Sequence, residues 1–150
     1  MNSGIIAEYY VLCELWRNDF RALKSDNPTE KGWDILVLLE QQNIKIQVKA
    51  IDWKSTSKVI NGNFGGDFDF LVLVLIGFNE KKYTVLVIPK SKFKKRPDTQ
   101  KNGITDINGN FLYTNTTSTW RTLDIKIHES VFKLYEDKWN QILELDHTIQ

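Results

Sequence analysis

The residues best suited to chemistry lie in one stretch of the chain, residues 32–50, which is GWDILVLLEQQNIKIQVKA. Two strand-like runs in it are separated by the polar turn EQQN. The first run opens with a carboxylate, Asp34, but is otherwise almost wholly apolar, as in a strand that is buried on both faces. The second run alternates, so Gln47 and Lys49 share one face. We therefore predict a hairpin that places Asp34 beside Gln47 and Lys49.

Groups of these types can carry out metal-assisted hydrolysis of a phosphodiester. Asp34 supplies a hard oxygen ligand for Mg²⁺ or Mn²⁺, and the amide of Gln47 and the backbone carbonyl of Val48 can add two more. Lys49 would stand beside the metal, where an ammonium group can orient or deprotonate water and offset the charge of a phosphate. Glu8 lies on a largely apolar helical segment, which fits a carboxylate that packs against the sheet and points at the same place.

A purely structural interpretation of the same residues stays open. Polar residues alternate along any half-exposed strand, so the short Gln47-x-Lys49 motif is weak by itself. In this interpretation Asp34 caps a strand, and Gln47 and Lys49 face solvent. Glu8 then lies on the wet side of its helix.

A single α/β domain spanning residues 1–150 has to position these side chains. We predict a helix from Ser3 to about Phe20, with Ser3 as N-cap and apolar residues at helical spacing. These apolar residues are Ile5, Tyr9, Leu12 and Trp16. The polar segment 21–32 is broken by Pro and Gly and is expected to form an edge strand or loop.

The second half of the chain continues the α/β pattern. Residues 69–78 and 83–90 are predicted to be buried strands joined by the turn NEKK, and residues 119–127 alternate as a further strand. Residues 98–119 are rich in Thr, Asn and Gly, which favours a long loop or a flexible hairpin. Residues 130–145 are predicted to be a helix, with one apolar face. That face consists of Val131, Leu134, Tyr135, Trp139 and Ile142.

Composition excludes several classes of protein. The 150 residues carry a formal net charge of +1, so any basic surface must be local. One cysteine, Cys13, excludes a disulfide framework, and with only two histidines it leaves no zinc-type cluster. Cys13 itself lies among core-like helix positions and is expected to serve packing. No run approaches the roughly 20 apolar residues of a membrane span, and no signal peptide is recognisable. We expect a soluble cytoplasmic protein.

Local basic segments are candidates for contact with nucleic acid. The densest positive charge is KSKFKKR at residues 90–96, and a second basic, hydroxyl-rich segment follows Trp53. Phosphate contacts come from residues of this kind, although solvated surface is the alternative for both segments. The candidate phosphate-contacting residues are Lys54, Lys58, Lys92, Lys94, Lys95 and Arg96. Asp69, before the third strong strand, is expected to cap a turn rather than join the site.

On these residues the chain resembles the PD-(D/E)XK nuclease superfamily, in particular its Mrr-type, Holliday-junction-resolvase-like and group I intron-associated branches. A helix with an interior Glu, a strand opening GWDILV and a strand ending IQVKA carry the resemblance, which spans about residues 4–89. It implies a restriction-endonuclease-like α/β fold, in which helices flank a mixed, largely antiparallel central sheet. Glu8 matches the carboxylate of the first helix, Asp34 the central metal-ligating Asp, and Lys49 the catalytic Lys. Gln47 departs from the pattern, because most members have Glu or Asp there.

The resemblance implies a Mg²⁺-dependent DNA endonuclease. One site of this type cuts one strand, so cleavage of a duplex implies a homodimer with two-fold symmetry. The alternative function is a catalytically inactive relative that binds nucleic acid or a partner protein through the same scaffold. Whether the substrate is duplex DNA, branched DNA or RNA stays open, as does the recognition sequence.

Overall fold

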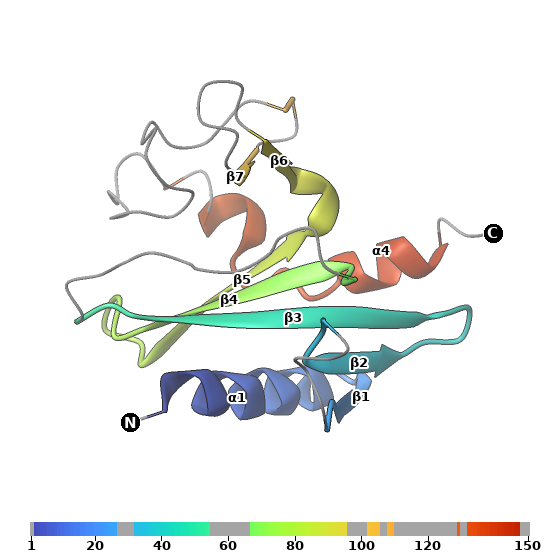
Figure 1. Cartoon of the computed structure of the whole chain (residues 1–150), viewed down its shortest axis with the longest axis horizontal. Helices are drawn as coiled ribbons and strands as arrows, with labels where there is room; N and C mark the ends of the chain where they lie inside the picture. The colour runs from blue at the N-terminus through green and yellow to red at the C-terminus, as the bar shows by residue number, and fades with distance from the viewer. Residues whose placement is uncertain are drawn as a thin grey trace.

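The computed structural model of the chain describes residues 2–26, 32–54, 67–95, 102–105, 108–109, 129 and 132–147. Within these residues a helix precedes five strands that form one sheet, and two short strands and a final helix follow (Figure 1). The elements are α1 (Ser3–Arg17), β1 (Arg21–Lys24), β2 (Ile35–Leu38), β3 (Asn43–Asp52), β4 (Phe70–Ile76), β5 (Tyr83–Pro89), the 3-10 helix η1 (Lys90–Lys92), β6 (Phe93–Lys95), β7 (Asn102–Ile104) and α4 (Gln141–His147). No helix among the described residues is long and apolar enough to cross a membrane.

The central sheet has the strand order β1-β2-β3-β4-β5. Its pairings are antiparallel except for β3 and β4, which run parallel from the Ile46–Phe70 pair to the Asp52–Ile76 pair. The predicted mixed and largely antiparallel sheet is therefore confirmed, and so is the hairpin of β2 and β3. Segment 21–32 was expected to be an edge strand or loop, and β1 is the edge strand.

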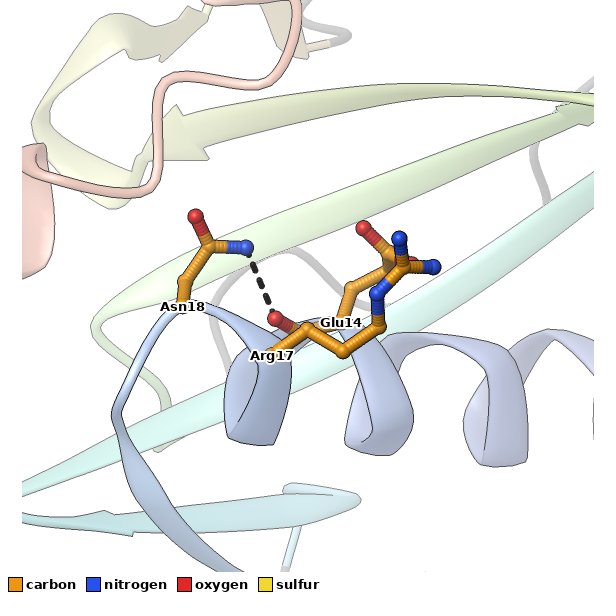
Figure 2. Close-up of polar contacts among 3 residues, drawn as sticks. All are labelled: Glu14, Arg17 and Asn18. Carbon is orange, nitrogen blue, oxygen red and sulfur yellow. Dashed lines mark hydrogen bonds and ion pairs between the residues drawn. The ribbon is translucent and has the colours of Figure 1, made fainter.

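Helix α1 begins and ends differently from the prediction. Its N-cap is Asn2 rather than Ser3, because Asn2 Oδ1 accepts a hydrogen bond from the backbone N–H of Ile5 at 3.2 Å. The helix ends at Arg17 rather than near residue 20. The Asn18 side chain donates to the carbonyl of Glu14 at 2.8 Å (Figure 2). Asp19 takes a positive φ of 66°. This side-chain bond satisfies one of the carbonyls that the end of a helix leaves without a helical partner.

The face of α1 that packs on the sheet is not the most apolar one. Ala7, Val11 and Leu15 are fully buried, because a face with smaller side chains lets the helix lie close to the sheet. Tyr9 and Trp16, from the predicted stripe, are each more than half exposed. Cys13 is also exposed, so the prediction that it packs in the core was wrong.

Two hydrophobic cores lie on the two faces of the sheet. One contains the buried face of α1 together with alternate residues of the strands, among them Ile35, Ile46 and Val48. The other contains the intervening residues of β4 and β5, such as Leu71 and Leu73. Because β4 is buried along its whole length, its apolar run is explained by burial on both faces.

The predicted C-terminal helix is interrupted where the chain crosses the edge of the sheet. Tyr135 and Trp139 are buried as expected, but they belong to the cores on opposite faces. Between them Glu136 forms an antiparallel bridge with Leu86, and Asp137 has a positive φ of 52°. A continuous helix could not turn around the edge strand β5, so a helical turn precedes this bend and α4 follows it.

Of two further predictions, the one for segment 98–119 is tested only at its start, and the one for residues 119–127 stays a prediction. Strands β6 and β7 pair antiparallel, from Phe93 with Ile104 to Lys95 with Asn102, so the start of segment 98–119 belongs to a hairpin. The strand predicted for residues 119–127 lies outside the described residues, and so does most of segment 98–119.

Candidate functional site

The site is built where β2 separates from β3. The last paired residues are Ile35 and Ile46, and beyond them the N–H of Asp34 donates to the carbonyl of Ile46 at 2.8 Å. The Asp34 carbonyl accepts from Ser25 at 2.7 Å, so it points toward β1 rather than β3. The Asp34 side chain takes the place of this carbonyl as the acceptor that faces β3, because its Oδ2 accepts the N–H of Val48 at 2.6 Å. One carboxylate oxygen is thereby held between the diverging strands.

Two other predicted site residues lie around this carboxylate. The pKa of Asp34 is raised to about 6, mainly by burial and also by a hydrogen bond with Glu8 and by the negative charge of Glu8. The N–H of Val48 and the charge of Lys49 act in the opposite direction and lower the pKa. The fold therefore brings Glu8 from α1, Asp34 from the start of β2 and Lys49 from β3 to one place.

Gln47 lies next to this cluster on β3. Its neighbour across the parallel pairing is Leu71, and Lys49 lies opposite Leu73, so Gln47 and Lys49 share one face of the strand. The side-chain oxygen Oε1 of Gln47 is buried and has no hydrogen-bond partner among the described residues. A buried acceptor without a donor or cation is unfavourable by about 1–3 kcal/mol, so this oxygen is available for a ligand.

These donors fit a hard divalent cation. Two converging carboxylates and an unpartnered amide oxygen are ligands that Mg²⁺ prefers in proteins. The described residues contain no group of three or more His, Cys, Asp or Glu side chains that could hold a metal, because the third polar position is Gln47 rather than an acid. A role for the backbone carbonyl of Val48 remains a prediction.

A lysine that the sequence analysis did not identify also belongs to the cluster. Lys24 Nζ, at the end of β1, lies 3.3 Å from Glu8 Oε2. Lys24 is paired with Ile35, the residue directly after Asp34. The local sequence of β1 carries no signal for this contact, which arises only because α1 packs beside β1.

The other predicted residues are placed around the sheet. The Asp69 carboxylate was expected to cap a turn, but its Oδ2 accepts the N–H of Lys45 on β3 at 2.8 Å and so joins the start of β4 to the neighbouring strand. The basic segment begins with η1 and β6, at the end of β5 that lies level with Asp34: Pro89 is opposite Phe70, and Phe70 is opposite Ile46. Three strand spacings, roughly 14 Å, separate β2 from β5.

The basic side chains that the structure describes differ in their exposure to solvent. Lys92 is half-buried, whereas Lys94 and Lys54 are exposed. The side chain of Lys95, and Lys58 and Arg96 as a whole, lie outside the described residues. The contact of all six with DNA remains a prediction.

The position of Asp34 yields a prediction about stability without metal. Its folded pKa of about 6 lies above the usual pKa of 3.8 for an aspartate, so the folded state binds the proton more tightly. The free energy of unfolding therefore falls as pH rises from about 4 to about 6. Asp34→Asn keeps an acceptor for Val48 but removes the charge. We expect it to be more stable than wild type at pH 8 by about 1–2 kcal/mol. Urea unfolding at pH 8 and pH 4, in EDTA, measures the difference.

At pH 4 this advantage should disappear, because the wild-type carboxyl group is then protonated in the folded state. Glu14→Gln, on the same helix as Glu8 but in an ion pair at 2.9 Å with Arg17, whose side chain is 75% exposed, is the control and should not reproduce the pattern. Equal stability of wild type and Asp34→Asn at both pH values would show that the Asp34 carboxylate is not destabilised by burial.

Comparison with known proteins supports the fold. No family model matches the chain, and no curated protein matches it by sequence. A solved structure of a bacterial homing endonuclease, I-Ssp6803I, matches with a TM-score of 0.56 and 18% identity, over 97% of this chain and 92% of that one. A Holliday junction resolvase, Hjc from Archaeoglobus fulgidus, matches with a TM-score of 0.40 and 17% identity, over 60% of this chain and 78% of that one. The match to I-Ssp6803I confirms the predicted α/β fold, in which helices flank a mixed central sheet.

Proposed function

We propose that the protein is a metal-dependent endonuclease that hydrolyses phosphodiester bonds in DNA. The observation that carries the proposal is the convergence of Glu8 and Asp34 beside Lys49, at the point where β2 leaves β3. The proposal is supported by the solved structure with the same fold, which is that of a homing endonuclease. Cleavage of both strands of a duplex needs two such sites, so the proposal includes a homodimer.

In this proposal each side chain has one task. Glu8 and Asp34 hold Mg²⁺ or Mn²⁺, and the side-chain oxygen of Gln47 and the carbonyl of Val48 complete the protein ligands. A bound metal of this kind lowers the pKa of water and stabilises charge on the phosphate. The N–H of Val48 fixes Oδ2 of Asp34, which leaves the other oxygen to face the ligand. Lys49 orients or deprotonates the attacking water, or offsets the phosphate charge.

One observation favours a second candidate, a relative that binds nucleic acid or a partner protein without cleavage. Gln47 supplies no negative charge where most members of the superfamily have an acid, so the described residues offer two carboxylates rather than three. Fewer charged ligands weaken the binding of a divalent cation. If the site binds no metal at millimolar concentration, this second function is favoured.

The deciding experiment is incubation with supercoiled plasmid, linear duplex, branched and single-stranded DNA, each in Mg²⁺, Mn²⁺ or EDTA. We expect cleavage of at least one substrate with metal and none in EDTA. Asp34→Asn, which preserves the hydrogen bond to Val48, should abolish cleavage without unfolding the protein. Cleavage that persists in EDTA or in Asp34→Asn would contradict the proposal, because the activity would then not come from this site.

The basic segment yields a prediction about DNA binding. If Lys92 and Lys94 contact phosphates, replacing both with Gln should weaken binding about equally for all sequences. The slope of log K against log salt should flatten by about 0.9 for each lost contact with duplex DNA. Fluorescence anisotropy with two unrelated duplexes over a range of salt concentrations measures both effects.

The control for this measurement is a second pair of lysines. Lys81 and Lys82 precede β5, whereas the basic segment follows it, so they lie at the opposite end of the sheet from the site. Replacing both with Gln changes the net charge by the same amount. An equal change of slope in the two double variants would mean that only net charge matters and that the basic segment makes no specific phosphate contacts.

A further inference from the structure

Lys24 is held in place by two neighbouring residues of α1. Its Nζ lies 3.3 Å from Glu8 Oε2, and the side chains of the pair are only 26% and 16% exposed. The same ammonium group lies 5.2 Å from the centroid of the Tyr9 ring. The contact is therefore shielded from solvent more than a typical surface ion pair, which contributes little.

The fold fixes the strand that carries Lys24 against both α1 and the site. Trp16 donates its indole N–H to the carbonyl of Ala22 at 3.1 Å, which attaches β1 to the helix. Ser25, directly after Lys24, donates to the carbonyl of Asp34 at 2.7 Å. Lys24 thus approaches the carboxylates from the β1 side, whereas Lys49 approaches them from β3.

Glu8 therefore has two competing partners. In the metal-free protein its carboxylate faces the ammonium of Lys24 on one side and the carboxyl group of Asp34 on the other. A divalent cation held by Glu8 and Asp34 would lie close to the ammonium and repel it, since like charges at about 4 Å interact by several kcal/mol near a protein surface. Binding of the metal must then weaken or break the contact between Lys24 and Glu8.

We propose that Lys24 is the counter-ion of Glu8 without metal and a contact to a DNA phosphate once metal is bound. This inference rests on the proposed function. Without metal, Lys24 offsets part of the repulsion between the two carboxylates. When the cation replaces it on Glu8, the ammonium is released beside the metal, where a phosphate bound to that metal would lie. Lys24 is therefore a residue that positions DNA and does so only in the metal-bound state.

This exchange couples the binding of metal to the binding of DNA. The phosphate contact is available only after the metal has taken Glu8, so metal should tighten DNA binding, and DNA should tighten metal binding by the same factor. Lys24→Met removes both the competitor for Glu8 and the phosphate contact. The variant should bind metal more tightly than wild type when DNA is absent, but the coupling between metal binding and DNA binding should be weaker.

The test measures two affinities separately, with Ca²⁺ as the metal probe and a fluorescent 30-base-pair duplex as the DNA probe. By calorimetry without DNA, we expect Lys24→Met to bind Ca²⁺ about five- to tenfold more tightly than wild type. By anisotropy, its DNA affinity should equal that of wild type in EDTA but be about five- to tenfold lower in saturating Ca²⁺. Lys24→Arg, which keeps the charge, should lie close to wild type in both measurements.

Lys81→Met is the matched control, because it removes a lysine from an ion pair with Glu136 at 3.6 Å that lies away from the site. It should change neither affinity beyond twofold. Should Lys24→Met fail to fold, as judged by its thermal transition, Lys24→Gln takes its place. Unchanged or weaker Ca²⁺ binding by the Lys24 variant, or an equal loss of DNA affinity with and without Ca²⁺, overturns this inference alone. If wild type binds neither Ca²⁺ nor Mg²⁺ and cuts no DNA, the proposed function fails as well.

Discussion

Lys49→Met is expected to lower the rate of DNA cleavage by about three orders of magnitude while metal binding is kept or becomes tighter. The reason is that Lys49 lies close enough to Asp34 to lower its pKa but cannot itself bind a cation. Loss of a group that transfers a proton or stabilises charge in the transition state typically reduces the rate by 10²–10⁴-fold. Single-turnover cleavage in Mg²⁺, together with calorimetric titration of the metal, separates the two effects.

Lys45→Met is the control on the same strand. Residues 45, 47 and 49 alternate onto one face of β3, but Lys45 Nζ pairs with Asp67 at 2.6 Å rather than with the site. This variant should cleave within about threefold of wild type. If Lys49→Met and Lys45→Met cleave equally fast, Lys49 has no role in the chemistry, and the structural interpretation of the strand is favoured.

Gln47→Glu is expected to tighten Mg²⁺ binding by at least about tenfold. The two side chains have nearly the same shape, so Glu introduces a negative charge where Gln47 has a buried oxygen that bonds to none of the described residues. An added charge a few Å from a divalent cation contributes several kcal/mol at an intermediate dielectric constant, of which repulsion by Glu8 and Asp34 cancels part. Calorimetry with Mg²⁺ measures the change in affinity.

The same variant should be less stable than wild type without metal, because three carboxylates then converge. Thermal unfolding in EDTA and in saturating Mg²⁺ shows whether metal restores the loss. Gln41→Glu adds the same charge in the turn at the other end of the β2–β3 hairpin and should alter neither quantity. Equal Mg²⁺ affinity in the two variants would mean that residue 47 does not face the metal.

The alternation of side chains along a strand is a local property, so the sequence predicted the features of the sheet that depend on this alternation. Alternation in β3 placed Gln47 and Lys49 on one face, and the polar turn before it indicated the pairing with β2. The continuous apolar runs of β4 and β5 likewise predicted strands buried on both faces. These inferences hold because side chains of a strand alternate whatever the rest of the chain does.

The helices show where local patterns were insufficient. Tyr9 and Trp16 have the helical spacing of an apolar stripe but are more than half exposed, because the sheet accepts the face with Ala7 and Val11, which allows a closer approach. At the C-terminus, Tyr135 and Trp139 have helical spacing but pack on opposite faces of the sheet. Hydrophobic periodicity identifies apolar residues but does not show which surface will cover them.

For the site, the sequence alone determined the residue types and their order along the chain: a carboxylate on the first helix, another at the start of a strand, and Gln47 and Lys49 on the next strand. Only the tertiary structure decided that the Asp34 side chain replaces the backbone of β2 as acceptor for Val48, and that Lys24 shares Glu8. Both depend on where β2 leaves β3 and on how α1 lies against β1. Such contacts join residues distant in sequence, and packing rather than local preference selects them.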